Sequence, residues 1–334
     1  MERTQHIGKT SFFSTLSRVL AGILTLFFIV ACEQQEPSQP LRVSSSNWPG
    51  YEPLYIAEAL NLYSNNDIHV IETPASMVLM QSLQAGTIDA AAISLSRALT
   101  FIQQGQDISI ILVLDWSNGA DQILARPPIK SIADIAGTNV AAESNTVNMF
   151  LLLRALESHG MSLEDINYAP MENEILGAAY GAGEIDVASA FGPAVNDMIA
   201  QGATKIFDSS QIPGEILDVL IVRTQYLKQN PSKVTNLVSG WLQAVEHIKN
   251  AQPDTKLPEG LLKSNDFMAV REQIKFAGTS ENTVFLGDNA RRLKDTIEKR
   301  LTTFQSISDQ MQFSSMPKIN TKPFENAQAL MKKD

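Results

Sequence analysis

Cysteine and histidine are scarce in this chain. Of its 334 residues, one is cysteine and four are histidine. A single cysteine excludes an internal disulfide framework and any metal or redox site built on paired cysteines. The histidines beyond the N-terminal segment are His69, His159 and His247, and none has a partner at a spacing typical of zinc ligands. We therefore expect no metal site and no cofactor.

Sequence motifs of common enzyme classes are missing as well. The chain contains neither an H-E-x-x-H metalloprotease motif nor a G-x-S-x-G nucleophile elbow. The glycine-rich segment 177–183 lacks the Lys-Ser/Thr pair of a phosphate loop, and its position at a helix end is wrong for one. The sequence thus favours a protein that is not an enzyme.

The first 31 residues are typical of a secretory signal peptide. Three basic residues, Arg3, Lys9 and Arg18, are followed by the apolar run Val19–Ala31. This run of about 13 residues is shorter than the roughly 20 that a membrane-spanning helix needs. The residues before Cys32 resemble a bacterial lipobox, which implies cleavage and lipidation at Cys32. An ordinary signal peptide beside an incidental cysteine is the alternative.

Residues 33–40 are polar and contain two prolines, so we interpret them as a tether. With a lipid on Cys32, the chain would be anchored on the periplasmic side of a bacterial membrane, either the inner or the outer one. More than one acyl chain is needed for firm anchoring.

Acidic residues outnumber basic ones. The net charge is −10, and residues 1–31 carry three basic residues and one acidic residue, so the remainder carries −12. Such a surface repels nucleic acids and anionic lipid headgroups, which makes both poor ligands. After the N-terminal segment, no apolar run is long enough to cross a membrane.

From Leu41 onward, β-rich runs alternate with helical patterns, which is typical of α/β proteins with mostly parallel sheets flanked by helices. The predicted strands are 41–45, 68–72, 90–94, 108–115, 139–143, 166–170, 186–190, 205–208 and 218–223. The predicted helices are 53–62, 76–85, 95–103, 146–158, 172–181 and 193–201, followed by a mainly helical C-terminal part.

One short pattern occurs twice. Ala85–Asp89 and Ala182–Asp186 both have the sequence Ala-Gly-x-Ile-Asp, 97 residues apart. In each copy we expect glycine to end a helix and Ile-Asp to begin a buried strand. The same offset pairs Ser94 with Phe191 at corresponding strand ends, although a chance repetition of a common turn is the alternative.

Two such units predict two lobes around a cleft. We expect the first lobe to comprise residues 41–121 and 215–334, and the second lobe to comprise residues 122–214. In open α/β sheets, ligands bind at the carboxyl ends of the strands. We therefore expect the ligand site in the cleft between the lobes.

Four turns should face this cleft: 47–51, 94–97, 115–121 and 143–146. In three of them, hydroxyl or amide residues precede a helix, whose free N–H groups suit an anionic or polar group. In the first turn, Trp48 and Tyr51 could form flat walls of a pocket, and the Pro-Gly turn could let the backbone approach a ligand. The predicted ligand-binding residues are Trp48, Tyr51, Ser94, Ser96, Asp115, Asn118, Glu143, Asn145, Thr146 and Phe191.

Several of these side chains have a second interpretation. Trp48 could pack in the core, and core packing is favoured for Tyr55. Asp115 and Glu143 could cap turns or accept hydrogen bonds from a ligand, and Arg97 could be an ordinary surface residue or an anion clamp. Because the four turns hold more acidic than basic residues, the sequence favours a ligand with N–H donors. An amine, amide, ureido or aminopyrimidine compound fits, with any acidic group bound at a helix N-terminus.

These motifs, in this order, resemble the periplasmic substrate-binding proteins of ABC importers. The resemblance is to the nitrate, sulfonate and taurine group, which shares its fold with thiamine-precursor-binding proteins. It covers about residues 41–250 and is carried by 48–57, 85–90, 114–121 and 132–143.

The resemblance implies a two-lobed periplasmic binding protein of type II that closes on its ligand and delivers it to a permease and its ATPase. We expect such a protein to act as a monomer. A sensory lipoprotein that presents its ligand-bound form to a membrane signalling protein is the alternative. For the C-terminal helices, we expect packing on the first lobe, with Arg291, Arg292, Lys294 and Arg300 on a solvated face.

Overall fold

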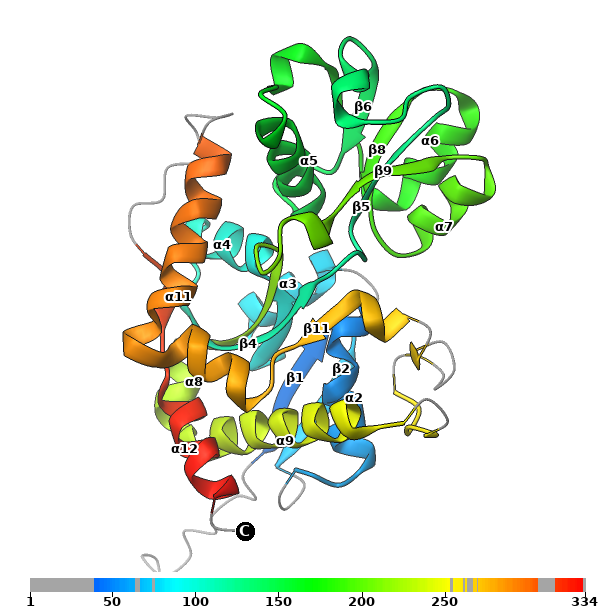
Figure 1. The fold of residues 1–334 in the computed structure, drawn as a ribbon. Coiled ribbons are helices and arrows are strands. Elements are labelled where there is room, and N and C mark those ends of the chain that lie inside the picture. The colour runs from blue at the N-terminus through cyan, green and yellow to red at the C-terminus, as the bar shows by residue number, and fades with distance from the viewer. Residues whose placement is uncertain are drawn as a thin grey trace, which may run out of the picture. The chain divides into compact units, whose positions relative to one another are not determined.

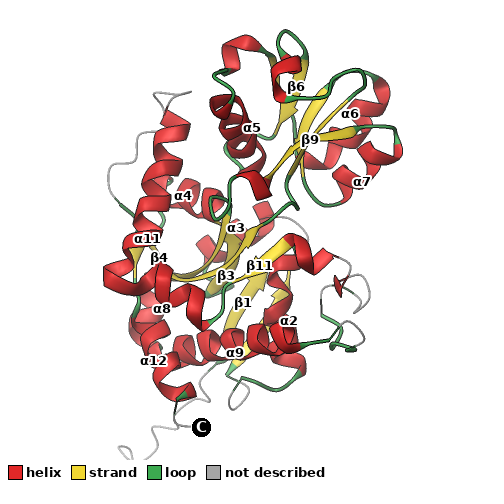
Figure 2. Cartoon of the chain, in the orientation of Figure 1, coloured by secondary structure: helices red, strands yellow, loops and turns green. Residues whose placement is uncertain are grey.

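The structure is a computed structural model that describes residues 39–63, 67–73, 76–252, 255–260, 262, 267, 268, 270–305 and 316–332. The predicted signal peptide, Cys32 and most of the predicted tether lie outside these residues. The described residues form an α/β fold with two separate sheets, each flanked by helices (Figures 1 and 2).

Seven strands of the described residues form the first sheet. They are β1 (Leu41–Ser45), β2 (Ile68–Glu72), β3 (Ala90–Ser94), β4 (Ile108–Ser117), β10 (Leu217–Arg223), β11 (Ile274–Phe276) and β12 (Lys318–Ile319). Their order is β11-β4-β10-β3-β1-β2, and β12 also pairs with β4. The apolar run of β4 is buried along almost its whole length, as a central strand with both faces covered should be.

The second sheet has five strands among the described residues. They are β5 (Gln122–Ala125), β6 (Asn139–Ala142), β7 (Asn167–Pro170), β8 (Val187–Ala190) and β9 (Thr204–Asp208), in the order β7-β6-β8-β5-β9. Both sheets are mostly parallel in strand direction. The reversed strands are β10 and β11 in the first sheet and β5 in the second.

Helices surround both sheets. Those near the first sheet are α2 (Glu52–Ala59), α3 (Ser76–Ala85), α4 (Leu95–Gln103), α8 (Thr224–Gln229), α9 (Pro231–Asn250), α11 (Thr279–Gln305) and α12 (Lys322–Met331). Those near the second sheet are α5 (Val147–Ser158), α6 (Leu176–Ala182) and α7 (Pro193–Ala200). The backbone of α11 departs from helical geometry between Gly287 and Ala290.

The internal repeat has the same local structure in both copies. Gly86 and Gly183 have positive φ angles of 74° and 75° at the helix ends, a conformation that glycine adopts at no steric cost. The carboxylates of Asp89 and Asp186 accept hydrogen bonds of 3.0 Å from the backbone N–H of Arg42 and Asn139, respectively. These partners are also 97 residues apart, which extends the repeat from one turn to a neighbouring strand.

The predicted strands are confirmed, most of them to within one residue, and β4 continues two residues further than predicted. Three strands were not predicted: β5, β11 and β12, which have two to four residues each. Such short segments carry too few alternations to give a periodic signal. The predicted helix 172–181 begins instead as a single 3-10 turn, and α6 starts at Leu176.

The chain crosses between the sheets twice, at 118–121 and at 209–216. The Ser209 hydroxyl of the second crossing accepts a 2.7 Å hydrogen bond from Gly119 N of the first crossing and forms a 2.6 Å hydrogen bond with Ser117 at the end of β4. A third link comes from α11, because Phe304 near its end is buried in the core of the second sheet. The C-terminal helices therefore do not pack on the first sheet alone, and the lobe limits given above stay a prediction.

Candidate functional site

A cavity of about 90 Å³ lies where the carboxyl ends of strands from both sheets meet. By the usual measure of roughly 10–15 Å³ per water, it has room for only a small solute. Its lining combines polar and apolar side chains, as ligand pockets do. The lining residues are Ser46, Trp48, Tyr51, Ile93, Ser94, Arg97, Ser117, Asp121, Glu143, Thr146, Val147, Phe191, Ile216 and Asp218.

Two aromatic rings meet across the cavity. Trp48 follows β1 in the first sheet and Phe191 follows β8 in the second, and their ring centroids lie 6.1 Å apart in an edge-to-face arrangement. The Pro49-Gly50 turn makes the position of Trp48 possible. A Cβ on Gly50 would lie 2.2 Å from Trp48 Nε1 and 2.6 Å from Asp115 Oδ2. Gly50 therefore accommodates Trp48 and Asp115, and it is not among the lining residues.

Two aspartates form the acidic end of the cavity. Asp121 lies just before β5 and Asp218 lies in β10, so each stands at the start of a reversed strand. They are also 97 residues apart and thus occupy equivalent positions in the two repeats. Both are buried, with exposed fractions of 3% and 7%. We call Asp121 and Asp218 the acid pair.

Burial raises the pKa of both members of the acid pair. The pKa of Asp121 rises to about 6, because burial outweighs the stabilising effects of Ser117 and Arg300. The pKa of Asp218 rises to about 8, through burial and the neighbouring charge of Asp121, although the Tyr51 hydroxyl donates a hydrogen bond to it. Near pH 7 the pair therefore holds roughly one proton and one negative charge. A cationic group in the cavity would draw that proton off.

An ion pair joins a helix beside the first sheet to a strand end of the second sheet at the edge of the cavity. Arg97 of α4 donates a 3.2 Å hydrogen bond to Glu143, which follows β6. Burial raises the pKa of Glu143, and the charge of Arg97 offsets part of that rise. Arg97 is the one basic side chain among the lining residues, against three carboxylic acids.

Two helices begin at the cavity. The Ser94 hydroxyl caps α4 by accepting a hydrogen bond from Arg97 N, and the Thr146 hydroxyl caps α5 by accepting one from Asn148 N. Both caps line the cavity. Helix N-termini carry partial positive charge, so this side of the cavity, together with Arg97, suits an acidic group.

Six of the ten predicted ligand-binding residues line the cavity: Trp48, Tyr51, Ser94, Glu143, Thr146 and Phe191. Ser94 and Phe191 were paired by the repeat, and the structure brings both to the same cavity. Tyr55 is outside the lining, and its hydroxyl forms a 2.8 Å hydrogen bond with Ser45.

The other four predicted residues lie outside the lining. Ser96 is buried, and its hydroxyl accepts a hydrogen bond from Arg300. Asp115 is fully buried behind Trp48, whose Nε1 donates to it at 3.4 Å. Asn118 lies in the first crossing, where its N–H donates to the carbonyl of Gln273. Asn145 is exposed, with a φ of 62° in the turn before α5.

The most informative residue missing from the prediction is Asp218. It lies inside an apolar strand, where a single acidic residue gives no periodic signal. The 97-residue offset, applied to Asp121, would have identified it. Ser46, Ile93, Ser117, Val147 and Ile216 are small or apolar side chains that only the three-dimensional arrangement brings to the cavity.

In the ranges that the structure describes, no helix is both long enough and apolar enough to span a bilayer. Within the same ranges, no three His, Cys, Asp or Glu side chains are placed to hold a metal ion.

Residues 34–257 match the model of the NMT1-like family. The chain belongs to this family. Among curated relatives of this NMT1-like protein is the taurine-binding periplasmic protein of Escherichia coli, 22% identical over 285 residues, which are 77% of this chain and 88% of the relative. A second relative in the same organism, assigned as an aliphatic sulfonates-binding protein, is 22% identical over 231 residues, which are 67% of this chain and 72% of the relative.

Solved structures of periplasmic binding proteins share the fold of this NMT1-like protein. The aliphatic sulphonate binding protein SsuA of Escherichia coli superposes with a TM-score of 0.62 at 17% identity, covering 79% of this chain and 85% of the other. SsuA from Xanthomonas axonopodis, bound to MOPS, gives 0.59 at 20% identity, covering 80% and 91%. The desulfurization enzyme DSZB gives 0.56 at 14% identity, covering 88% and 99%, so the fold also occurs in an enzyme.

The ion pair between Arg97 and Glu143 should make a small contribution to closure of the cavity. Their side chains are 31% and 23% exposed, and partly solvated pairs of this kind contribute about 1 kcal/mol or less. We expect Glu143→Gln to lower ligand affinity by about threefold to fivefold at low salt, and by less in 0.5 M NaCl. Calorimetric titration at both salt concentrations measures this. Glu164→Gln, an exposed change outside the lining, should have no effect at either. An equal loss at both salt concentrations would contradict an electrostatic role.

Proposed function

We propose that this protein is the periplasmic solute-binding component of an ABC importer. Its ligand would be a small solute that carries an amine, and an acidic group on the same molecule would suit the opposite side of the cavity. The acid pair carries this proposal. Two buried carboxylic acids, one from each repeat, line a small cavity in which Arg97 is the only basic side chain.

The two sides of the cavity have complementary charge preferences. Asp121 and Asp218 would accept hydrogen bonds from an ammonium group, and charge-assisted bonds of this kind are stronger than neutral ones. The N-termini of α4 and α5, with Arg97, would receive a sulfonate or carboxylate group. Trp48 and Phe191 would cover the apolar part of the ligand. Taurine, an aminosulfonate, has both charged groups, and a relative in Escherichia coli is a taurine-binding protein.

Lining residues from both lobes support capture by closure of the cleft. The ligand would contact Tyr51 and Ser94 on one side and Thr146 and Phe191 on the other. It would therefore favour the arrangement in which the two sides are close together. The closed form would then deliver the ligand to a membrane permease. Lipidation at Cys32 would keep the protein beside that permease. The enzyme among the structural relatives does not change this proposal, because fold does not determine function.

A matched pair of solutes tests the proposal directly. Taurine and isethionate differ in one position, where isethionate carries a hydroxyl group in place of the amine. We expect taurine at about 100 times its dissociation constant to raise the melting temperature by about 5 °C, and isethionate to give a much smaller rise. Aminopyrimidines, urea, β-alanine, nitrate and sulfate complete the panel.

The pH dependence of binding is a second test. Because the pKa of Asp121 is about 6, taurine affinity should rise as pH increases from 5 to 7.5. Stronger binding of isethionate, nitrate or sulfate than of any amine would contradict the proposed ligand class. Conversion of the bound solute into a product would contradict the binding role.

A further inference from the structure

Arg300 is buried, contrary to the expectation of a solvated face. Its exposed fraction is 0%, whereas Arg291 and Arg292 on the same helix are exposed as expected. A fully buried arginine is uncommon unless its charge and donors are satisfied. The surroundings of Arg300 therefore indicate what it does.

The guanidinium group contacts three separate elements. It donates hydrogen bonds to the hydroxyl of Ser96 in α4 and to the backbone carbonyl of Glu215 in the second crossing. It also lies over the ring of Phe150 in α5, with its central carbon 3.9 Å from the ring centroid. One side chain from α11 thus holds together a helix of the first lobe, a crossing segment and a helix of the second lobe.

Each of these three elements also supplies residues to the cavity. Ser96 lies between the lining residues Ser94 and Arg97, and Glu215 directly precedes Ile216. Phe150 is one helical turn beyond Thr146 and Val147, which line the cavity as well. Arg300 therefore lies behind the cavity wall and contacts no bound solute itself.

The titratable groups at the acid pair, its two members included, come from five elements. Tyr51 of η1 (Pro49–Tyr51) donates a hydrogen bond to Asp218, and Asp115 of β4 adds a further buried acid. Asp121 and Asp218 come from the first crossing and from β10. Arg300 of α11 is the cation whose charge opposes the raised pKa of both members of the acid pair. Burial lowers the pKa of Arg300 to about 10, so it stays charged at neutral pH.

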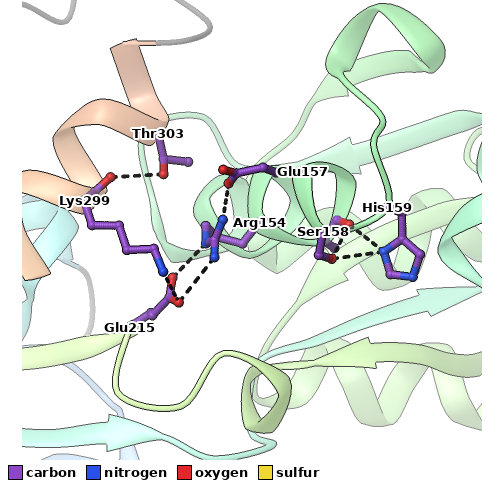
Figure 3. Close-up of polar contacts among 8 residues, drawn as sticks. Arg154, Glu157, Ser158, His159, Glu215, Lys299 and Thr303 are labelled. Atoms are coloured by element: carbon purple, nitrogen blue, oxygen red, sulfur yellow. Dashed lines mark hydrogen bonds and ion pairs between the residues drawn. The ribbon is translucent and has the colours of Figure 1, made fainter.

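A second group of contacts holds this part of α11 in place. Figure 3 shows Arg154 of α5 and Lys299 of α11 both directed at the carboxylate of Glu215. Arg154 Nε lies 2.7 Å and Lys299 Nζ 2.5 Å from its oxygens. Burial disfavours the charged form of Glu215, but the hydrogen bonds from Arg154 and Lys299 outweigh it and hold the pKa of Glu215 below its ordinary value. One helical turn beyond Arg300, Phe304 packs against Phe150 at 6.0 Å.

We propose that Arg300 is the positioning residue of this binding site. It holds α4, the second crossing and α5 in the arrangement that forms the cavity, and its positive charge favours the negative charge that the acid pair carries near neutral pH. The inference rests on the proposed function for its ligand class. Its effect on the acid pair does not depend on which solute binds.

The ligand-free protein provides the decisive measurement. Carboxyl-carbon NMR titration of Asp121 and Asp218, assigned with the D121N and D218N variants, reports the pH midpoints of the acid pair. We expect R300M to raise these midpoints by about one pH unit. R300K keeps a positive charge and should leave them near their wild-type values. R292M, an exposed change on the same helix, should not move them.

Binding provides the second measurement. We expect R300M to weaken taurine binding by about 30-fold at pH 7.5 and R300K to cause an intermediate loss, since lysine cannot form both hydrogen bonds and the ring contact. If R300M does not fold, R300K and Ser96→Ala still test the positioning role, because each removes part of the contact and keeps a cation on α11.

Unchanged midpoints in R300M, or an equal rise in R300M and R292M, would overturn the role of Arg300. If the wild-type protein binds no amine while R300M still shifts the midpoints, the proposed ligand is wrong and the role of Arg300 stands. If the wild-type protein binds taurine and R300M binds it equally well, the role of Arg300 is wrong and the proposed ligand stands.

Discussion

Asp121→Asn should weaken taurine binding by about a hundredfold at pH 7.5 without lowering the melting temperature of the ligand-free protein. Asparagine keeps the shape of the side chain and removes its negative charge. A hydrogen bond to a charged group contributes about 1.5–3 kcal/mol, and a hundredfold loss corresponds to about 2.7 kcal/mol. Isothermal titration calorimetry gives the affinity, and thermal unfolding gives the stability.

The stability part of this prediction follows from the sign of the pKa shift. Burial raises the pKa of Asp121 to about 6, above its ordinary value, so the folded state favours the protonated acid. The stability that Asp121 contributes is therefore fully present below about pH 4 and is lost as pH rises through 6. At pH 7.5 the wild-type protein buries a charge that the variant lacks, so the variant should be at least as stable.

Asp107→Asn is the matched control, because Asp107 is exposed and pairs with Lys318 away from the cavity. It should leave taurine affinity unchanged. An affinity loss in Asp121→Asn that merely follows a lower melting temperature would mean that Asp121 supports the fold and does not contact the ligand.

Asp89→Asn should lower the free energy of unfolding by about 2–3 kcal/mol at pH 7. Asp89 is 1% exposed and pairs with two arginines, Arg42 at 2.9 Å and Arg223 at 2.5 Å. Removing one partner from a buried ion pair typically costs 3–5 kcal/mol, and the partial exposure of both arginines reduces that figure. Urea unfolding followed by circular dichroism measures the change.

The contribution of Asp89 to stability depends on pH in the opposite direction to that of Asp121. Burial disfavours the ionised form of Asp89, but hydrogen bonds from Arg42 and Arg223 outweigh it and lower the pKa of the carboxyl. The stability that Asp89 contributes is present above about pH 4 and is lost as pH falls through its folded-state pKa. The difference between wild type and variant should therefore be full at pH 7 and shrink in acid.

The repeat supplies the control for this experiment. Asp186 occupies the position of Asp89 in the second copy of the repeat and makes the same bond to a backbone N–H, but no ion pair joins it to a described basic side chain. Asp186→Asn keeps an acceptor for that bond and should cost less than about 1 kcal/mol. Equal losses in the two variants would show that the backbone bond, and not the arginine pairs, stabilises this turn.

Much of the fold could be predicted because local patterns and tertiary structure agree. The runs at Leu41–Ser45 and Ala90–Ser94 are buried strands between turn signals, and Gly86 and Gly183 end helices in the conformation that glycine favours. The crossing of α11 to the second core was beyond prediction. Phe304 packs in the core of the second sheet, which is far from it in the sequence, and no local sequence pattern predicts such a contact.

The sequence predicts the lining residues that lie at strand ends. It does not predict the residues that support the cavity wall from behind. Ser94 and Phe191 were placed by strand ends and by the repeat. Ser96 was placed by the same reasoning, but residues two apart on a helix point in different directions, so Ser96 faces Arg300 instead. Arg300 has the sequence neighbourhood of a surface residue, and only tertiary packing reveals its burial.

The order of strands in the first sheet also bears on how the chain is made. β10 lies between β3 and β4, yet about 100 residues, including the whole second sheet, separate it from β4 in the sequence. During synthesis the second sheet has all its strands while the first sheet still lacks its middle one. Until β10 has been synthesised, the edges of β3 and β4 that pair with it stay unpaired. Pairing between strands so far apart in the sequence is slow. The first sheet therefore cannot be completed before the chain has been synthesised as far as Arg223, the last residue of β10.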